Sequence, residues 1–137
     1  MITASAWSAG PPERLWALAS DVDRWAERLP TVDSVRELGR TGAGVGSRYE
    51  VRQPGMPRAV WEITAWQERS FTWVSRAPGI RSTAVHTVSQ DGTGSRLELS
   101  LEWDGVLAPV VRRLLGARST DMVEREAETF ARLAEQV

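Results

Sequence analysis

The sequence has no cysteine and no lysine, and it contains a single histidine, His86. Disulfides, thiolate metal sites and Schiff-base chemistry on a lysine amine are therefore excluded. One histidine without any thiolate makes a zinc site improbable, so no metal ligand is assigned. The 17 basic residues, all arginine, are nearly balanced by 18 acidic residues. This balance gives no electrostatic reason to expect nucleic-acid binding.

Long apolar runs are also missing, and those present are too short to span a bilayer. The first residues contain no basic segment followed by an apolar run, so no signal peptide is predicted and a cytoplasmic location is expected. No phosphate-binding glycine motif follows a predicted strand, so no cofactor is expected. We interpret the glycine-rich segment 42–46 as a connecting turn.

The 137 residues are predicted to form one domain, residues 1–137. A first strand is expected over 2–7, and two short helices over 14–20 and 22–28, with Asp21 as the N-cap of the second. From Val32 to Trp103 the apolar pattern mainly has the two-residue period of strands. The predicted strands cover residues 32–38, 47–53, 60–67, 71–76, 81–88 and 96–104.

The last of these strands has the clearest alternation, with Leu97, Leu99, Leu101 and Trp103 on one face. Such strands form an antiparallel sheet with one buried face, which another element must cover. Residues 106–137 are long enough for a single helix to do so. Pro109 is tolerated only in the first turn, so this helix should start near residues 106–108.

The predicted buried stripe of the long helix has bulky residues at its ends and small ones in the middle. It comprises Val110, Leu114, Ala117, Thr120, Val123, Ala127, Phe130, Ala134 and Val137. Either Trp61, Trp73 and Trp103 fill the space opposite the small residues, or an apolar pocket remains there. In the second case the predicted ligand-binding residues are Trp61, Ile63, Trp73, His86, Leu99, Trp103, Ala117, Thr120, Val123 and Ala127.

Several segments resemble polyketide cyclase/dehydrase-like proteins. The similar segments are Ala9–Trp16, Asp21–Trp25 with Leu29-Pro30, Trp61–Trp66, and His86–Val88 with Asp91–Leu97, so the resemblance extends over nearly the whole chain. The chain is thus similar to the START-like (SRPBCC) superfamily. The resemblance implies an α+β helix-grip fold, in which a curved antiparallel sheet of about seven strands wraps around a long C-terminal helix. Two short helices follow the first strand in this fold, and an apolar cavity lies between sheet and helix.

His86 and Tyr49 are the candidate catalytic residues. Histidine titrates near neutral pH and suits proton transfer, and a tyrosine hydroxyl can donate to a ligand carbonyl. The alternatives are a hydrogen-bonded interior histidine and a core tyrosine without chemical roles. Arg76 and Arg81 flank the Pro78-Gly79 turn, either at the mouth of a cavity or simply in solvent, and Glu62 and Glu98 are expected on the outer surface.

Members of the superfamily include lipid carriers, receptors and cyclases, so the resemblance does not select one activity. Our first hypothesis is binding of a hydrophobic small molecule, such as a lipid, isoprenoid or polyketide-like compound. The second is a polyketide cyclase, aromatase or dehydratase acting in the same cavity. The third is a partner-binding regulator that uses the loops at 54–57 and 77–79. No stable membrane insertion is expected, and the sequence leaves a homodimer open.

Overall fold

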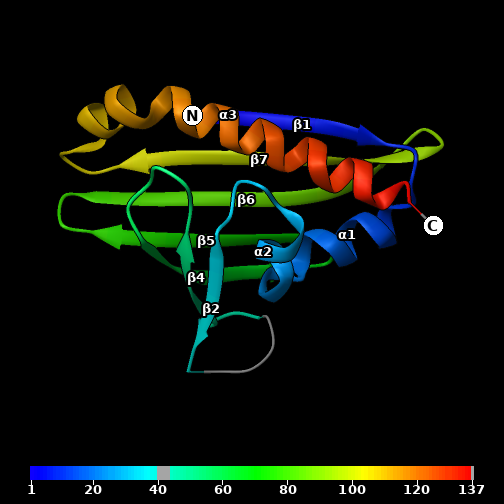
Figure 1. The fold of residues 1–137 in the computed structure, drawn as a ribbon, viewed down its shortest axis with the longest axis horizontal. Helices are drawn as coiled ribbons and strands as arrows, with labels where there is room; N and C mark the ends of the chain where they lie inside the picture. The colour runs from blue at the N-terminus through cyan, green and yellow to red at the C-terminus, as the bar shows by residue number, and fades with distance from the viewer. Residues whose placement is uncertain (40–43, 137) are drawn as a thin grey trace.

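The computed structural model describes residues 1–39 and 44–136. It confirms the predicted helix-grip fold, in which one antiparallel sheet is accompanied by a long C-terminal helix (Figure 1). The strands are adjacent in the order β1-β7-β6-β5-β4-β3-β2. Residues 42–43 of the predicted glycine-rich turn, and Val137 of the predicted stripe, lie outside the described residues. The elements are β1 (Ile2–Ser8), α1 (Pro12–Ser20), η1 (Val22–Arg24), α2 (Trp25–Arg28), β2 (Ser34–Leu38), β3 (Arg48–Arg52), β4 (Ala59–Gln67), β5 (Ser70–Ala77), β6 (Ile80–Asp91), β7 (Gly94–Asp104) and α3 (Ala108–Ala134).

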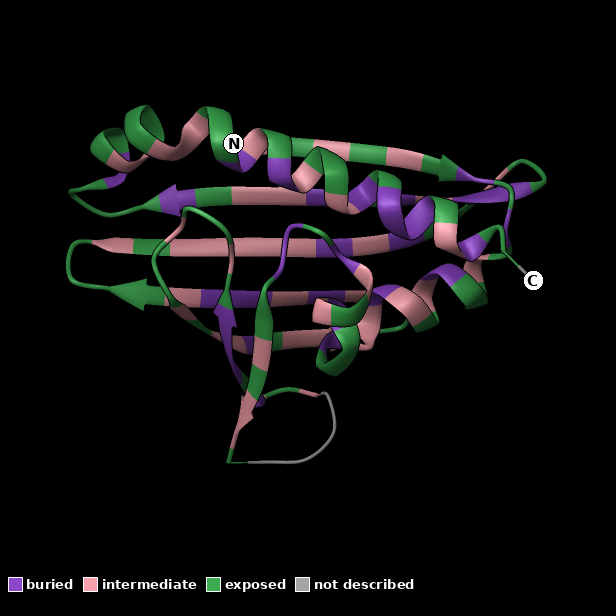
Figure 2. Cartoon of the chain, in the orientation of Figure 1, coloured by how far each residue is buried: buried purple, intermediate pink, exposed green. Residues whose placement is uncertain are grey.

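The long helix α3 packs mainly on β1 and β7, at one edge of the sheet. Its C-terminal end is fixed there by close contacts. Ser8 donates a hydrogen bond of 2.7 Å from its Oγ to the carbonyl of Ala131, and the backbone of Gly10 lies directly against Ala134. Because a side chain at position 10 would collide with the Ala134 carbonyl, only glycine permits this approach. Buried residues accordingly concentrate toward this end of α3 (Figure 2).

The predicted buried stripe of α3 is wrong in its first half. Val110 and Leu114 are 52% and 74% exposed, and Ala117 is also exposed. A step of three residues falls short of a full helical turn by about 60°. The three successive steps from Leu114 to Val123 therefore carry the stripe about half a turn around the helix. The residues that do face the sheet include Ala108, Ser119, Met122, Ala127 and Phe130.

A register shift in β4 corrects a second prediction. The sequence places Trp61, Ile63 and Ala65 on one face, but the pairing of β4 with β5 shifts between Ile63 and Ala65. Such a bulge reverses the alternation beyond it. Trp66, rather than Ala65, therefore stands beside Phe71 on the inner face, with ring centroids 5.4 Å apart.

The short helices are placed as predicted, but their start is not capped as expected. Asp21 makes no side-chain cap hydrogen bond. Its carboxylate instead lies 3.2 Å from Nη1 of Arg28, at the end of α2. This ion pair links the ends of the η1–α2 segment, so Asp21 organises the turn by charge rather than by capping.

Candidate functional site

An aromatic cluster fills the interior at the end covered by α1 and α2. Trp25 of α2 is at its centre, with its ring centroid 5.1 Å from Trp73 and 5.8 Å from Phe130. Phe71 and His86 are cross-strand partners, and their rings stack with centroids 4.3 Å apart. Of the three tryptophans that the sequence suggested as filling, Trp73 lies in this cluster and Trp61 stacks on it. However, Trp25, which the sequence assigns only to a helix, is central to the filling.

Away from this cluster, the face of the sheet turned toward α3 is only half-buried. Ile2 of β1 pairs with Leu101 of β7, which pairs on its other side with Ala84 of β6. Ala4 lies two residues after Ile2 and therefore points to the same inner face. All of these inward residues are partly exposed, and so is Trp61 at the other side of the sheet. We call this set, Ile2, Ala4, Trp61, Ala84 and Leu101, the apolar strip. Figure 2 shows the change from buried to half-buried residues along the strands. An accessible apolar surface therefore adjoins the aromatic cluster.

The predicted ligand-binding residues divide into three groups by burial. Ile63, Trp73, His86, Leu99, Trp103 and Ala127 are buried, Trp61, Thr120 and Val123 are half-buried, and Ala117 is exposed. The hydroxyl of Thr120 donates to the carbonyl of Gly116 in its own helix, at 2.8 Å. Of these residues, Trp61 and Val123 pack against the core while keeping part of their apolar surface accessible.

His86 is buried on the inner face, as the alternation predicts. Burial lowers the pKa of its imidazole to about 3, and a hydrogen bond with the Phe71 backbone opposes this effect only in part. Nδ1 is buried without a hydrogen-bond partner among the described residues. At neutral pH the ring is therefore uncharged and only weakly basic.

Tyr49 is fully buried and lies beside acidic groups. Burial raises its pKa above the usual range, and the carboxyl groups of Glu37 and Asp23 add to the effect. Among the residues that the structure describes, its hydroxyl makes no hydrogen bond of regular geometry, although Glu37 and Ser47 are close enough to affect its pKa. The pKa of Asp23 is raised as well, by burial and by Glu37. Tyr49 thus remains a protonated donor over the physiological pH range.

Two polar residues of α3 were missed by the sequence analysis. Ser119 is buried, and its Oγ has no hydrogen-bond partner among the described residues. Glu126 lies one turn after Met122 and one turn before Phe130, so it shares the side of the helix that faces the sheet. Burial raises the pKa of its carboxyl group to about 8. The sequence signal for Glu126 is its helical spacing from Phe130.

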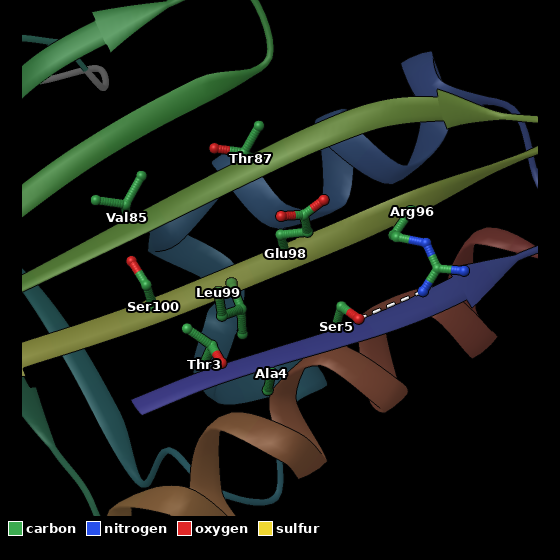
Figure 3. A pocket seen from close by; sticks show the side chains of 9 residues that line it. All are labelled: Thr3, Ala4, Ser5, Val85, Thr87, Arg96, Glu98, Leu99 and Ser100. Atoms are coloured by element: carbon green, nitrogen blue, oxygen red, sulfur yellow. Dashed lines mark hydrogen bonds between the residues drawn. The ribbon is translucent and has the colours of Figure 1, made fainter. Parts of the chain in front are cut away.

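A groove of about 710 Å³ opens on the other face of the sheet, over β1, β6 and β7. Figure 3 shows Thr87, Glu98 and Ser100 on this face, with Arg96 donating to the hydroxyl of Ser5. Arg96 also contacts Asp91 at 2.7 Å. Glu98 is exposed here, as expected of an outer-surface residue, whereas Glu62 on β4 is only half-exposed. The groove is lined mostly by polar side chains and does not suit an apolar molecule.

The predicted arginine pair flanks the β5–β6 turn. Arg76, Arg81 and Asp104 line a small groove of about 380 Å³ at this end of the sheet. Arg81 is paired with Asp104 at 3.5 Å, and both side chains are about half exposed. These arginines therefore lie at the tip of a hairpin, in contact with solvent.

Two further features concern metal ions and membranes. Among residues 1–39 and 44–136, no three or more histidine or carboxylate side chains gather in an arrangement suited to a metal ion. In the same ranges, no helix has the combined length and apolar character needed to cross a bilayer.

Comparison with known proteins places the chain in a broad group. The model of the family described as "Polyketide cyclase / dehydrase and lipid transport" matches residues 2–135. A search of curated proteins finds no match.

Solved structures share the fold at low sequence identity. A protein from Thermus thermophilus is 22% identical, with a TM-score of 0.73, covering 97% of this chain and 95% of its own. A hypothetical protein from Helicobacter pylori is 10% identical, with a TM-score of 0.83 and coverages of 97% and 86%. Norcoclaurine synthase from Thalictrum flavum, in complex with dopamine and hydroxybenzaldehyde, is 16% identical, with a TM-score of 0.76 and coverages of 96% and 84%.

Proposed function

Because the chain belongs to the polyketide cyclase / dehydrase and lipid transport family, we propose that it binds a hydrophobic small molecule on the α3 side of its sheet. The molecule lies against the apolar strip and ends at the aromatic cluster. Trp61 forms the boundary, since its ring stacks on Trp73 at 5.3 Å while its own surface is partly accessible. A lipid, an isoprenoid and a polyketide-like compound all have the required apolar surface.

The observation that carries this proposal is a pair of buried polar atoms that have no hydrogen-bond partner in the part of the chain that the structure describes. Nδ1 of His86 belongs to the sheet, and Oγ of Ser119 belongs to α3. Buried polar groups in native proteins are nearly always hydrogen-bonded, and exceptions call for an explanation such as a ligand or water. A mostly apolar ligand with one or two oxygen atoms satisfies both requirements, because it covers the strip and bonds to these atoms.

Native mass spectrometry tests the proposal directly. The purified protein is incubated with palmitic acid, farnesol or naringenin, which represent the three ligand classes. We expect a one-to-one complex with at least one of them. The variant Ala84→Phe, which fills the strip, should lose this complex, whereas Val85→Phe changes the adjacent residue on the opposite face and should retain it. The absence of a complex with all three compounds would contradict the proposal.

A second candidate function is catalysis, and Glu126 is the observation that favours it. A carboxyl group with a pKa of about 8 is protonated at neutral pH and can donate its proton to a carbonyl oxygen while water takes the proton from the neighbouring carbon, which forms the enol. This is the proton transfer that cyclisation or dehydration of a polyketide requires. His86 remains a candidate in this chemistry as a neutral hydrogen-bonding group rather than as a base, and Tyr49 as a donor.

Deuterium exchange on acetylacetone in heavy water, followed by NMR, tests this second function. The protein should accelerate exchange at the carbon between the two carbonyl groups. Glu126→Gln should remove the acceleration, while Glu124→Gln, an exposed residue on the same helix, should leave it unchanged. Exchange that is no faster than in buffer leaves ligand binding as the only supported function.

A further inference from the structure

The N-terminal end of α3 carries an unusual group of exposed apolar residues. Val106 is 85% exposed, Leu107 44%, Val110 52% and Leu114 74%. Single exposed apolar residues are common, but four within nine consecutive positions form a continuous patch. Leu107, Val110 and Leu114 are spaced by three and four residues, so they share one side of the helix. We call Val106, Leu107, Val110 and Leu114 the exposed apolar patch.

The patch is a regular part of the fold. On the other side of the same turns, Ala108 is buried and Val111 and Leu115 are half-buried, so the helix is anchored to the sheet there. The backbone N–H of Leu107 also donates to the carbonyl of Gly79 at 2.9 Å. This bond ties the patch to the β5–β6 turn, which brings Arg76 to the same end of the molecule.

Arginines outnumber carboxylates around the patch, since the one acidic residue of 104–120, Asp104, is already paired with Arg81. Residues 105–120 contain Arg112, Arg113 and Arg118 but no acidic residue, although the whole chain has a net charge of -1. Within residues 1–39 and 44–136, neither Arg112 nor Arg113 forms an ion pair, and both are exposed. On the helix, Arg118 continues the row of Val110 and Leu114 by one more turn, and Arg113 lies about 60° to one side of Val110. Arg118 additionally donates to the carbonyl of Gly55 in the β3–β4 loop.

We propose that this end of the molecule docks on the surface of a membrane containing anionic lipids. An apolar helix face with arginines beside it and at its end is suited to the interface of a bilayer, where the apolar side chains enter the acyl boundary and the guanidinium groups meet phosphates. The positive charge favours this occupant over a second copy of the chain, because two such ends would repel one another. The contact is peripheral and requires no helix that spans the bilayer.

Vesicle co-sedimentation tests the proposal with two lipid compositions. We expect the full chain to sediment with vesicles of phosphatidylcholine and phosphatidylglycerol in equal amounts, but not with pure phosphatidylcholine. Binding should weaken as salt is raised, because salt screens the arginines from the lipid phosphates. Val110→Ser with Leu114→Ser, and separately Arg112→Gln with Arg113→Gln, should each weaken binding to the anionic vesicles by about tenfold or more.

Matched controls separate docking from general effects. Val60→Ser changes an apolar residue that is 38% exposed on β4, and Arg132→Gln changes an exposed arginine near the other end of α3. Both should bind vesicles like the unchanged protein, and thermal melts should show that all four variants fold. Failure to bind anionic vesicles would overturn the proposal, and so would equal losses in the controls. A concentration-dependent dimer, dissociated by the Val110 and Leu114 changes in the absence of vesicle binding, would assign the patch to self-association instead. Ligand binding on the other side of α3 is measured separately by mass spectrometry.

Discussion

The imidazole of His86 stacks face to face on the phenyl ring of Phe71, with centroids 4.3 Å apart and planes inclined by 6°. This neutral ring belongs to the aromatic cluster on the inner face of the sheet. Its replacement by alanine removes the stack and leaves a cavity, so His86→Ala should lower the free energy of unfolding by about 2–5 kcal/mol. Urea denaturation measures this loss. An unchanged midpoint would show that the ring is not packed as described.

The same residue predicts a pH dependence of stability on the acidic side. The folded state keeps His86 neutral down to a pKa of about 3, whereas the unfolded chain protonates it near its ordinary value of 6.5. The free energy of unfolding should therefore fall as the pH falls from 6.5 to 3, by up to about 1.4 kcal/mol per pH unit. In His86→Phe, which retains a ring, this contribution should be absent. Equal acid sensitivity of both proteins would contradict the low pKa.

Glu126 predicts the opposite dependence at higher pH. Its folded-state pKa of about 8 exceeds the ordinary value of 4.5, so the folded state retains a proton that the unfolded chain has lost. The contribution of this carboxyl group to stability should therefore decrease as the pH rises from 4.5 to 8. Denaturation between about pH 7 and 8 largely separates the effect, since His86 is mostly neutral in both states there. Glu126→Gln should be less sensitive to pH in this range, and Glu124→Gln should match the unchanged protein.

Substitution of Ser119 tests whether its hydroxyl binds a ligand or has only a structural role. Its Oγ is buried without a partner among the described residues, so Ser119→Ala removes an unsatisfied group and should leave stability unchanged or raise it by up to about 1 kcal/mol. If the hydroxyl bonds to a ligand, the same change should weaken binding of an oxygen-containing probe such as naringenin. Ser100→Ala, on the other face of β7, is the control. A stability loss without any change in affinity would assign Ser119 a structural role.

The fold followed from local patterns that the structure retains. Alternation in β7 and the meander before it predicted the sheet, and the position of Pro109 predicted where α3 begins within two residues. These features depend on neighbouring residues in the sequence. The resemblance at residues 9–16 and 21–25 then indicated the order of the elements. For this reason the architecture could be predicted before any coordinates were known.

The interior could not be predicted as well, because the residues that face inward depend on the rotation of α3 about its axis and on the register of the strands. The predicted stripe contains three successive three-residue steps, which carry it about half a turn around α3. Its first half therefore lies on the exposed side of the helix. The bulge in β4 exchanged Ala65 for Trp66 on the inner face, and no local signal marks it. Trp25 reaches the centre of the aromatic cluster through tertiary packing of a four-residue helix. Glu126, by contrast, was predictable from its spacing to Phe130.

Binding of 8-anilinonaphthalene-1-sulfonate, followed by its fluorescence, most directly tests whether the apolar strip accepts a guest. The unchanged protein should enhance the fluorescence of this probe, and Ala84→Phe should reduce its affinity by at least about tenfold, because the added ring occupies the strip. Val85→Phe, one residue further on the opposite face, should bind as the unchanged protein does. The account is contradicted if Val85→Phe abolishes binding while Ala84→Phe does not, since the guest would then lie in the outer groove.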